Sequence, residues 1–176
     1  MLDVGVNREA TGFAVPNPAY AGRVAASFER QAFMGLLGAR VALVEPGACD
    51  IELPFRPELA QQHGFFHGGV VGTLADNACG YASFTLAPAD SSILTVEYKL
   101  NLMAPAAGAV LIARGRVIRP GRTLVVARAD VSVRRPDGVE KTVATALATL
   151  MLMAGMADEP SVTPGNGRAR EGGAER

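Results

Sequence analysis

A nearly uninterrupted apolar stretch in the middle of the chain constrains the fold more than any other feature. Residues 69–85 (GVVGTLADNACGYASFT) are rich in Val, Leu, Ala and Gly. A helix that is apolar on nearly all sides is buried on most sides. Gly72 and Gly80 each cost about 1 kcal/mol of helix propensity, which close packing against another element would offset. We therefore predict a long helix over residues 69–85 at the centre of the fold.

Three shorter elements are predicted ahead of this helix. Apolar residues recur at every fourth position over residues 19–37, which indicates an amphipathic helix. These residues are Val24, Phe28, Ala32 and Leu36. Two short strands are expected over residues 41–45 and 51–56, separated by the turn residues Pro46 and Gly47.

Four consecutive strands are predicted after the central helix. Alternation over residues 94–102 indicates a strand with two unlike faces. One face would carry Leu94, Val96, Tyr98, Leu100 and Leu102, and the other Thr95, Glu97, Lys99 and Asn101. Three further strands are expected over residues 110–118, 123–133 and 141–153, joined by turns that contain Pro and Gly. This order of elements predicts an α+β fold, with an antiparallel sheet wrapped around the long helix.

The predicted domain lies between two irregular ends. Residues 1–18 mix Gly, Asn and Pro and are expected to form an irregular lead-in, and residues 19–153 hold the domain. Residues 154–176 contain Gly, Pro and charge without periodicity, so a disordered tail is expected there.

Composition narrows the class of protein. Lys+Arg and Asp+Glu are 17 each, and this balance argues against a nucleic-acid-binding protein and against attraction to anionic membranes. The sequence shows neither a signal peptide nor an apolar run long enough to span a membrane, and its two Cys make no disulfide framework. We expect a cytoplasmic protein. Hydrophobic residues make up 49% and charged residues 19%, so apolar surface would remain for self-association.

Asp76 is the only formally charged residue between Leu59 and Ala89, and it lies within the predicted helix. It is about two turns from the helix start, so it is not an N-terminal cap. A carboxylate among apolar residues is costly unless it is paired or has a function. Asp76 is therefore a candidate catalytic residue. The alternatives are a solvated helix residue and a carboxylate bonded to the backbone.

The sequence His67-Gly68-Gly69 at the helix start is a second candidate site. Unpaired N–H groups of a first helical turn stabilise negative charge, so Gly69 could form an oxyanion hole. The alternative is a simple tight turn into the helix. Gly69 and Asp76 are separated by roughly 10.5 Å of helix, too far for one carbonyl to contact both. An active site that uses both would therefore be shared between two subunits with antiparallel helices.

Other nucleophiles and a metal site are weaker candidates. Cys79 has no His near it in the sequence, and buried free Cys is usually inert. Ser83 lacks a GxSxG motif. His63 and His67 are four residues apart without further metal ligands, so no metal site is predicted, and His67 is expected to organise the turn.

Arginines are concentrated late in the chain. Between Val110 and Arg135 there are seven Arg against one acid, Asp130. Most of them would belong to a solvated strand face. The alternative is a site for a phosphorylated ligand, because the Arg fork matches phosphate oxygens.

Together these motifs resemble those of hotdog-fold thioesterases of the phenylacetate-pathway (PaaI-like) group. The resemblance covers roughly residues 27–153. It rests on Gln61, His67-Gly68-Gly69, Leu74-Ala75-Asp76-Asn77-Ala78, Val96-Glu97-Tyr98, Met103-Ala104-Pro105-Ala106 and Gly121-Arg122-Thr123. It implies the hotdog fold, in which an antiparallel sheet wraps a long central helix.

The resemblance also implies roles for individual residues. Asp76 would be the catalytic carboxylate, as general base on water or as nucleophile. Gly69, with Gly68 and His67 shaping the turn, would polarise the thioester carbonyl. Gln61, in a position that the family usually gives to Asn, would hold the water or the thioester.

Three further residues would surround the reacting groups. Thr95 would lie near the attacking water, and Arg119 and Arg122 would contact the phosphates of coenzyme A.

The expected protein is an acyl-CoA thioesterase that releases a carboxylic acid and CoA without a metal or a separate cofactor. It would be a homodimer or a dimer of dimers, that is, a homotetramer. Alternatives are a hotdog dehydratase or hydratase, which would need a catalytic His, and a non-catalytic acyl-CoA-binding protein, which would not need Asp76.

Overall fold

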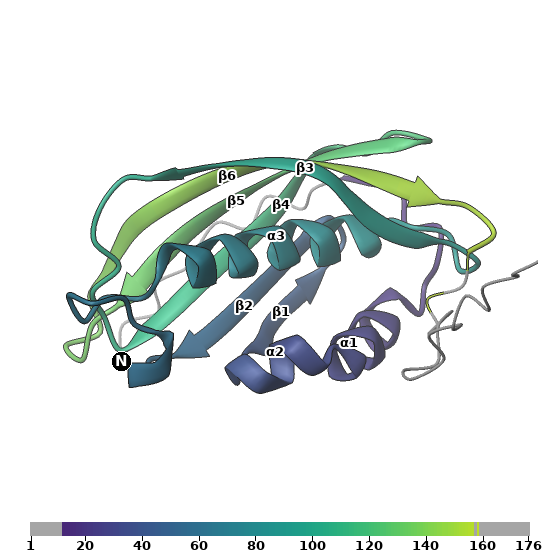
Figure 1. The fold of residues 1–176 in the computed structure, drawn as a ribbon. Helices are drawn as coiled ribbons and strands as arrows, with labels where there is room; N and C mark the ends of the chain where they lie inside the picture. The colour runs from purple at the N-terminus through teal and green to yellow at the C-terminus, as the bar shows by residue number, and fades with distance from the viewer. Residues whose placement is uncertain (1–11, 157, 159–176) are drawn as a thin grey trace, which may run out of the picture.

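The computed structural model describes residues 12–156 and 158. Its elements are α1 (Tyr20–Arg30), α2 (Ala32–Leu37), β1 (Arg40–Glu45), β2 (Ala48–Pro54), a short 3₁₀ turn (Pro57–Leu59), α3 (Gly68–Phe84), β3 (Ser92–Leu102), β4 (Val110–Arg119), β5 (Leu124–Arg134) and β6 (Glu140–Met153). The six strands form one antiparallel sheet in the order β1-β2-β4-β5-β6-β3. The sheet curves over α3, and α1 and α2 lie below (Figure 1). The predicted α+β hotdog architecture is confirmed.

The central helix packs closely against the sheet. α3 matches the predicted helix to within one residue, and Leu74, Ala78 and Cys79 on it are fully buried. Gly115 on β4 lies directly against its backbone, because a Cβ there would be 2.1 Å from the carbonyl oxygen of Ala78. Only glycine allows helix and sheet to approach so closely.

The first helical segment differs from the prediction of one helix over residues 19–37. Gln31 has an extended ψ of 92° and separates α1 from α2. The break changes the buried face, which is formed by Val24 and Phe28 and then by Met34 and Leu37. Ala32 and Leu36 are exposed, so the period of four is correct only as far as Phe28. 

Both predicted irregular ends lie partly outside the described residues. Residues 12–19 contain no helix or strand. Residues 1–11, 157 and 159–176, which hold the rest of the lead-in and most of the predicted tail, are not described. Within the described part of the chain, no helix is long and apolar enough to cross a membrane.

Candidate active site

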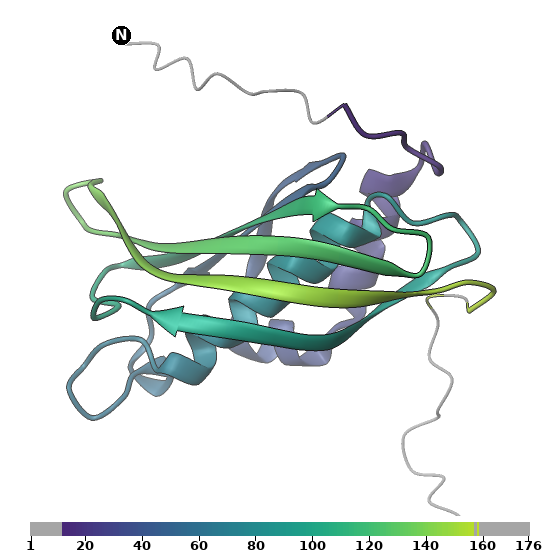
Figure 2. The ribbon, with the colours of Figure 1, turned by 90° about the horizontal axis from the view of Figure 1, so that it is seen from above.

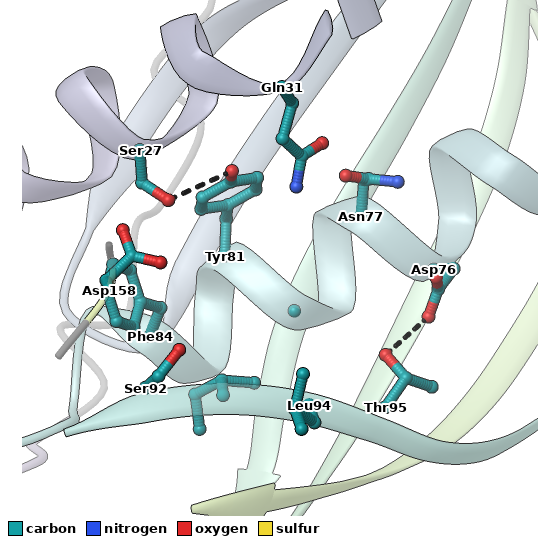
Figure 3. A pocket seen from close by; sticks show the side chains of 12 residues that line it. Ser27, Gln31, Asp76, Asn77, Tyr81, Phe84, Ser92, Leu94, Thr95 and Asp158 are labelled. Atoms are coloured by element: carbon teal, nitrogen blue, oxygen red, sulfur yellow. Dashed lines mark hydrogen bonds between the residues drawn. The ribbon is translucent and has the colours of Figure 1, made fainter. Parts of the chain in front are cut away.

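Asp76 lies on the side of α3 that faces β3, one of the two edge strands of the sheet, and it is half-buried. Its Oδ1 accepts a 2.8 Å hydrogen bond from Thr95 Oγ1 (Figure 3). Burial raises the pKa of the Asp76 carboxyl, and the hydrogen bond from Thr95 opposes that rise. No described residue forms an ion pair with Asp76. A carboxylate with a raised pKa and no counter-ion is suited to accept a proton or to attack a carbonyl.

The contact between Thr95 and Asp76 depends on a bulge in β3. The register against β6 shifts between Thr95 and Glu97, which leaves Val96 as an extra residue. Thr95 consequently points to α3, as does Tyr98, whose ring lies over Gly72. The predicted strict alternation, which placed Thr95 on the face opposite to Tyr98, is therefore wrong at the bulge.

A cavity of about 240 Å³ runs from Asp76 along α3 toward the start of β3. Figure 3 shows Asp76 and Thr95 at one end of it, and Ser27, Tyr81 and Phe84 toward the other. The cavity therefore offers space for a substrate group directly beside the carboxylate.

His67 caps the start of α3. Its ring Nδ1 accepts a 2.9 Å hydrogen bond from the backbone N–H of Gly69, which confirms that His67 organises the turn. The amide of Gly69, the predicted oxyanion donor, is therefore occupied by the His67 ring. The N–H of Gly68, the first residue of α3, has no acceptor among the described residues.

Gln61 is held in the loop ahead of α3. The side-chain carbonyl of Gln61 accepts a hydrogen bond from the backbone N–H of His63. The backbone N–H of Gln61 donates to the backbone carbonyl of Phe65 at 2.8 Å. Neither Gln61 nor the two glycines line the cavity beside Asp76. One protomer thus brings Asp76 and Thr95 together and leaves the other predicted site residues apart, in agreement with the helix-length argument.

The arginines divide into paired and unpaired groups. Arg114, Arg116 and Arg134 form ion pairs across the sheet with Asp50, Glu52 and Glu140, and Arg128 pairs with Asp130. The solvated-face interpretation holds for these four. Arg119, Arg122 and Arg135 are exposed, and none of the three has an ion-pair partner among the described residues. Two of these, Arg119 and Arg122, lie at the connection between β4 and β5 and are the residues expected to contact CoA phosphates.

The weaker candidates gain no support as reactive groups. Cys49 and Cys79 are both buried, and burial raises the pKa of each thiol to about 12, so neither is a thiolate at neutral pH. The described residues contain no cluster of three or more His, Cys, Asp or Glu that could hold a metal ion.

Sequence reasoning missed several residues that line the cavity. Asn77 and Tyr81 are four residues apart and share a face of α3, which their spacing could have indicated. Ser27 and Gln31 reach the cavity from α1 and from the break that follows it. No local pattern indicated their position, because it depends on how α1 packs against α3.

Comparisons with known proteins identify the family. The family sequence model of the thioesterase superfamily matches residues 63–140 of this chain. A Saccharolobus solfataricus protein described as a candidate esterase is 30% identical over 121 residues, which cover 69% of this chain and 77% of the relative. The crystal structure of a thioesterase family protein from Silicibacter pomeroyi is 46% identical and has a TM-score of 0.76. That match covers 77% of this chain and 99% of the other.

The fold has further relatives of lower identity. The PaaI protein from the phenylacetic acid degradation operon of E. coli aligns with a TM-score of 0.69 at 20% identity, over 82% of this chain and 99% of that one. This likeness agrees with the hotdog topology of the sheet and of α3. The chain therefore belongs to the thioesterase superfamily and is a hydrolase with the hotdog fold.

Proposed function

We propose that this protein is an acyl-CoA thioesterase in which Asp76 acts on the thioester carbonyl. The observation that carries the proposal is the half-buried Asp76 carboxylate, bonded to Thr95 at the end of a cavity, in a chain of the thioesterase superfamily. Asp76 takes a proton from water, the water oxygen bonds to the carbonyl carbon, and the C–S bond then breaks. The CoA sulfur leaves and takes up a proton, so the products are a carboxylic acid and CoA. Alternatively, a carboxylate oxygen of Asp76 bonds to the carbonyl carbon, and the C–S bond breaks so that CoA leaves and takes up a proton. Water then hydrolyses the resulting anhydride, which releases the carboxylic acid and restores Asp76.

The site is completed by a second copy of the chain. β3 is an edge strand, and Figure 2 shows it along the free side of the sheet. It presents Leu94, Val96 and Leu102 with 52%, 54% and 58% of their surface exposed. A long apolar edge of this kind pairs readily with another strand. Antiparallel pairing of two β3 strands would set the two α3 helices antiparallel, and this arrangement brings the glycines of one subunit toward Asp76 of the other.

The thioester oxygen is held at the start of the partner's α3. The free N–H of Gly68 is one donor, and Gly69 becomes a second when His67 releases it. Gln61 holds the water or the thioester from the preceding loop. The nucleotide end of CoA lies toward Arg119 and Arg122, whose guanidinium groups have no ion-pair partner among the described residues.

Thiol release from a panel of acyl-CoAs tests the proposal. We expect the native protein to hydrolyse members of the panel and Asp76→Asn to be at least ~100-fold slower. Asp130→Asn is the matched control, because Asp130 also accepts a hydrogen bond from a threonine, Thr145, but lies outside the cavity. Equal rates for native protein and Asp76→Asn would exclude Asp76 from the mechanism. Tight binding without turnover by the native protein would favour an acyl-CoA-binding protein instead.

Mixing two inactive variants tests the shared site. Gly68→Pro removes the free N–H at the first helical position, where proline is favoured, and its Cβ would approach only the end of the Leu102 side chain, at 3.0 Å. After mixing and reassociation with Asp76→Asn, we expect about a quarter of native activity, because half of the random dimers are mixed and each has one intact site. Activity that stays at the level of the separate variants would contradict a site built from two subunits.

A further inference from the structure

The end of the cavity away from Asp76 has a polar wall that the proposed hydrolysis does not use. Tyr81 and Ser27 are 6% and 8% exposed, and their hydroxyl oxygens lie 3.3 Å apart. Gln31 and Asn77 line the same cavity, and Figure 3 shows their side-chain amides pointing toward one another. The polar wall thus has Ser27 and Tyr81 at the end away from Asp76, with Gln31 and Asn77 between that end and the carboxylate (Figure 3).

The bond between Ser27 and Tyr81 leaves hydrogen-bonding capacity unused. A hydroxyl has one donor and two acceptor sites, so a single bond between two hydroxyls leaves one O–H and several lone pairs free. Burial raises the pKa of Tyr81, so its phenol is neutral and keeps the proton. Apolar atoms packed against this wall would leave these groups unpaired, which costs binding free energy.

The cavity has room for a short acyl group. It is partly open, and an enclosed cavity of roughly 150 Å³ accommodates benzene, so about 240 Å³ is enough for an acyl group somewhat larger than a single ring. Asp76 and Tyr81 are separated by about 7.5 Å along the axis of the helix, so the polar wall lies several ångströms from the carboxylate. None of the described residues that line the cavity is a Lys or an Arg, so nothing there favours an anionic end group. The lining also includes Asp158, but its carboxylate is paired with Arg30 at 2.6 Å, so no unpaired charge at that end favours a cationic group.

We propose that this cavity is the acyl pocket and that Tyr81 and Ser27 make it selective for short acyl groups with an uncharged hydrogen-bonding group at the far end. The inference rests on the proposed thioesterase activity. It adds the chemical class of acyl group, which the family and the catalytic carboxylate leave open. A site built to bond a substrate hydroxyl discriminates against an analogue without it, because its own polar groups are then left unpaired.

A matched pair of substrates tests the selectivity. Heptanoyl-CoA and 6-hydroxyhexanoyl-CoA have acyl groups with the same number of non-hydrogen atoms and differ only in a terminal methyl or hydroxyl group. We expect the native protein to favour the hydroxylated substrate by about tenfold in kcat/KM, the value of one hydrogen bond. Tyr81→Phe is expected to bring the ratio near one and Ser27→Ala to lower it. Ser83→Ala removes another buried hydroxyl from α3, bonded to Cys79 and outside the cavity, and leaves the ratio unchanged.

The outcomes separate this inference from the proposed function. Hydrolysis of both substrates with a ratio near one in the native protein, or a ratio that Tyr81→Phe leaves unchanged, overturns the polar selectivity alone. If the native protein hydrolyses other acyl-CoAs but neither member of the pair, the polar selectivity is again overturned and the thioesterase activity is not. Failure to hydrolyse any acyl-CoA overturns the thioesterase assignment, and this inference with it.

Discussion

The two sides of α3 are built in opposite ways. On the side toward β4, Ala78 and Cys79 are fully buried, and Gly115 lets the helix backbone touch the strand. On the side toward β3 and α1, the helix presents Asp76, Asn77 and Tyr81 to a cavity. One helix therefore carries a close-packed face and an open polar face.

The difference shows what each side contributes. Close packing stabilises the fold and tolerates no added atom. The open side holds a carboxylate whose pKa is raised by burial, so its charged form destabilises the folded state. Mutations on the packed side should therefore lower stability, and mutations on the open side should lower activity.

Two glycine substitutions should change stability in opposite directions, and Gly115→Ala should have the largest effect of all. In Gly115→Ala the new Cβ would lie 2.1 Å from the carbonyl oxygen of Ala78, so we expect a loss of more than about 3 kcal/mol in the free energy of unfolding. In Gly80→Ala the nearest heavy atom, on Leu150, is 3.8 Å away, and we expect a gain of about 0.5–1 kcal/mol from helix propensity. Urea denaturation of both variants and of the native protein measures the change in the free energy of unfolding. A tolerated Gly115→Ala would contradict the close-packed face.

Replacing Thr95 should affect activity and its pH dependence. Thr95→Val keeps the β-branched shape but removes the hydrogen bond that lowers the pKa of Asp76. The acid limb of the kcat/KM profile should therefore move to higher pH, and kcat/KM below neutral pH should fall about tenfold. Thr149→Val is the control, because Thr149 bonds Glu97 on the exposed side of the sheet. A profile of Thr95→Val that matches the native one would separate Thr95 from the titration of Asp76.

Cys79 should give the smallest change in activity. It is buried on the close-packed face, and its thiol is protonated at neutral pH. We expect Cys79→Ala to keep kcat/KM within about twofold and to lose about 1 kcal/mol of stability to the small void. Thiol-release assays and thermal melts measure both. A loss of activity without a loss of stability would show that Cys79 has a chemical role.

The sequence predicted the features that follow from local pattern. The apolar run over α3 predicted the buried helix, and the isolated charge of Asp76 indicated the residue that the structure places beside a cavity. Alternation could not reveal the bulge at Val96, because a bulge depends on pairing with β6. The same limit applies to Ser27 and Gln31, which reach the cavity through a helix break and tertiary packing. The cytoplasmic location and the absence of a cofactor stay predictions.

The melting temperature of Asp76→Asn, measured beside its activity, tests most directly whether the open face serves chemistry at the expense of stability. The folded state raises the pKa of Asp76, so the charged carboxylate destabilises the fold. This destabilisation is absent at pH below the ordinary carboxyl range and fully present once the pH exceeds the raised pKa. We expect Asp76→Asn to melt at a higher temperature than the native protein near neutral pH. The gain should shrink as pH falls through the carboxyl range, while hydrolysis is at least ~100-fold slower. A variant that hydrolyses at the native rate, or that melts lower at neutral pH, would contradict the account.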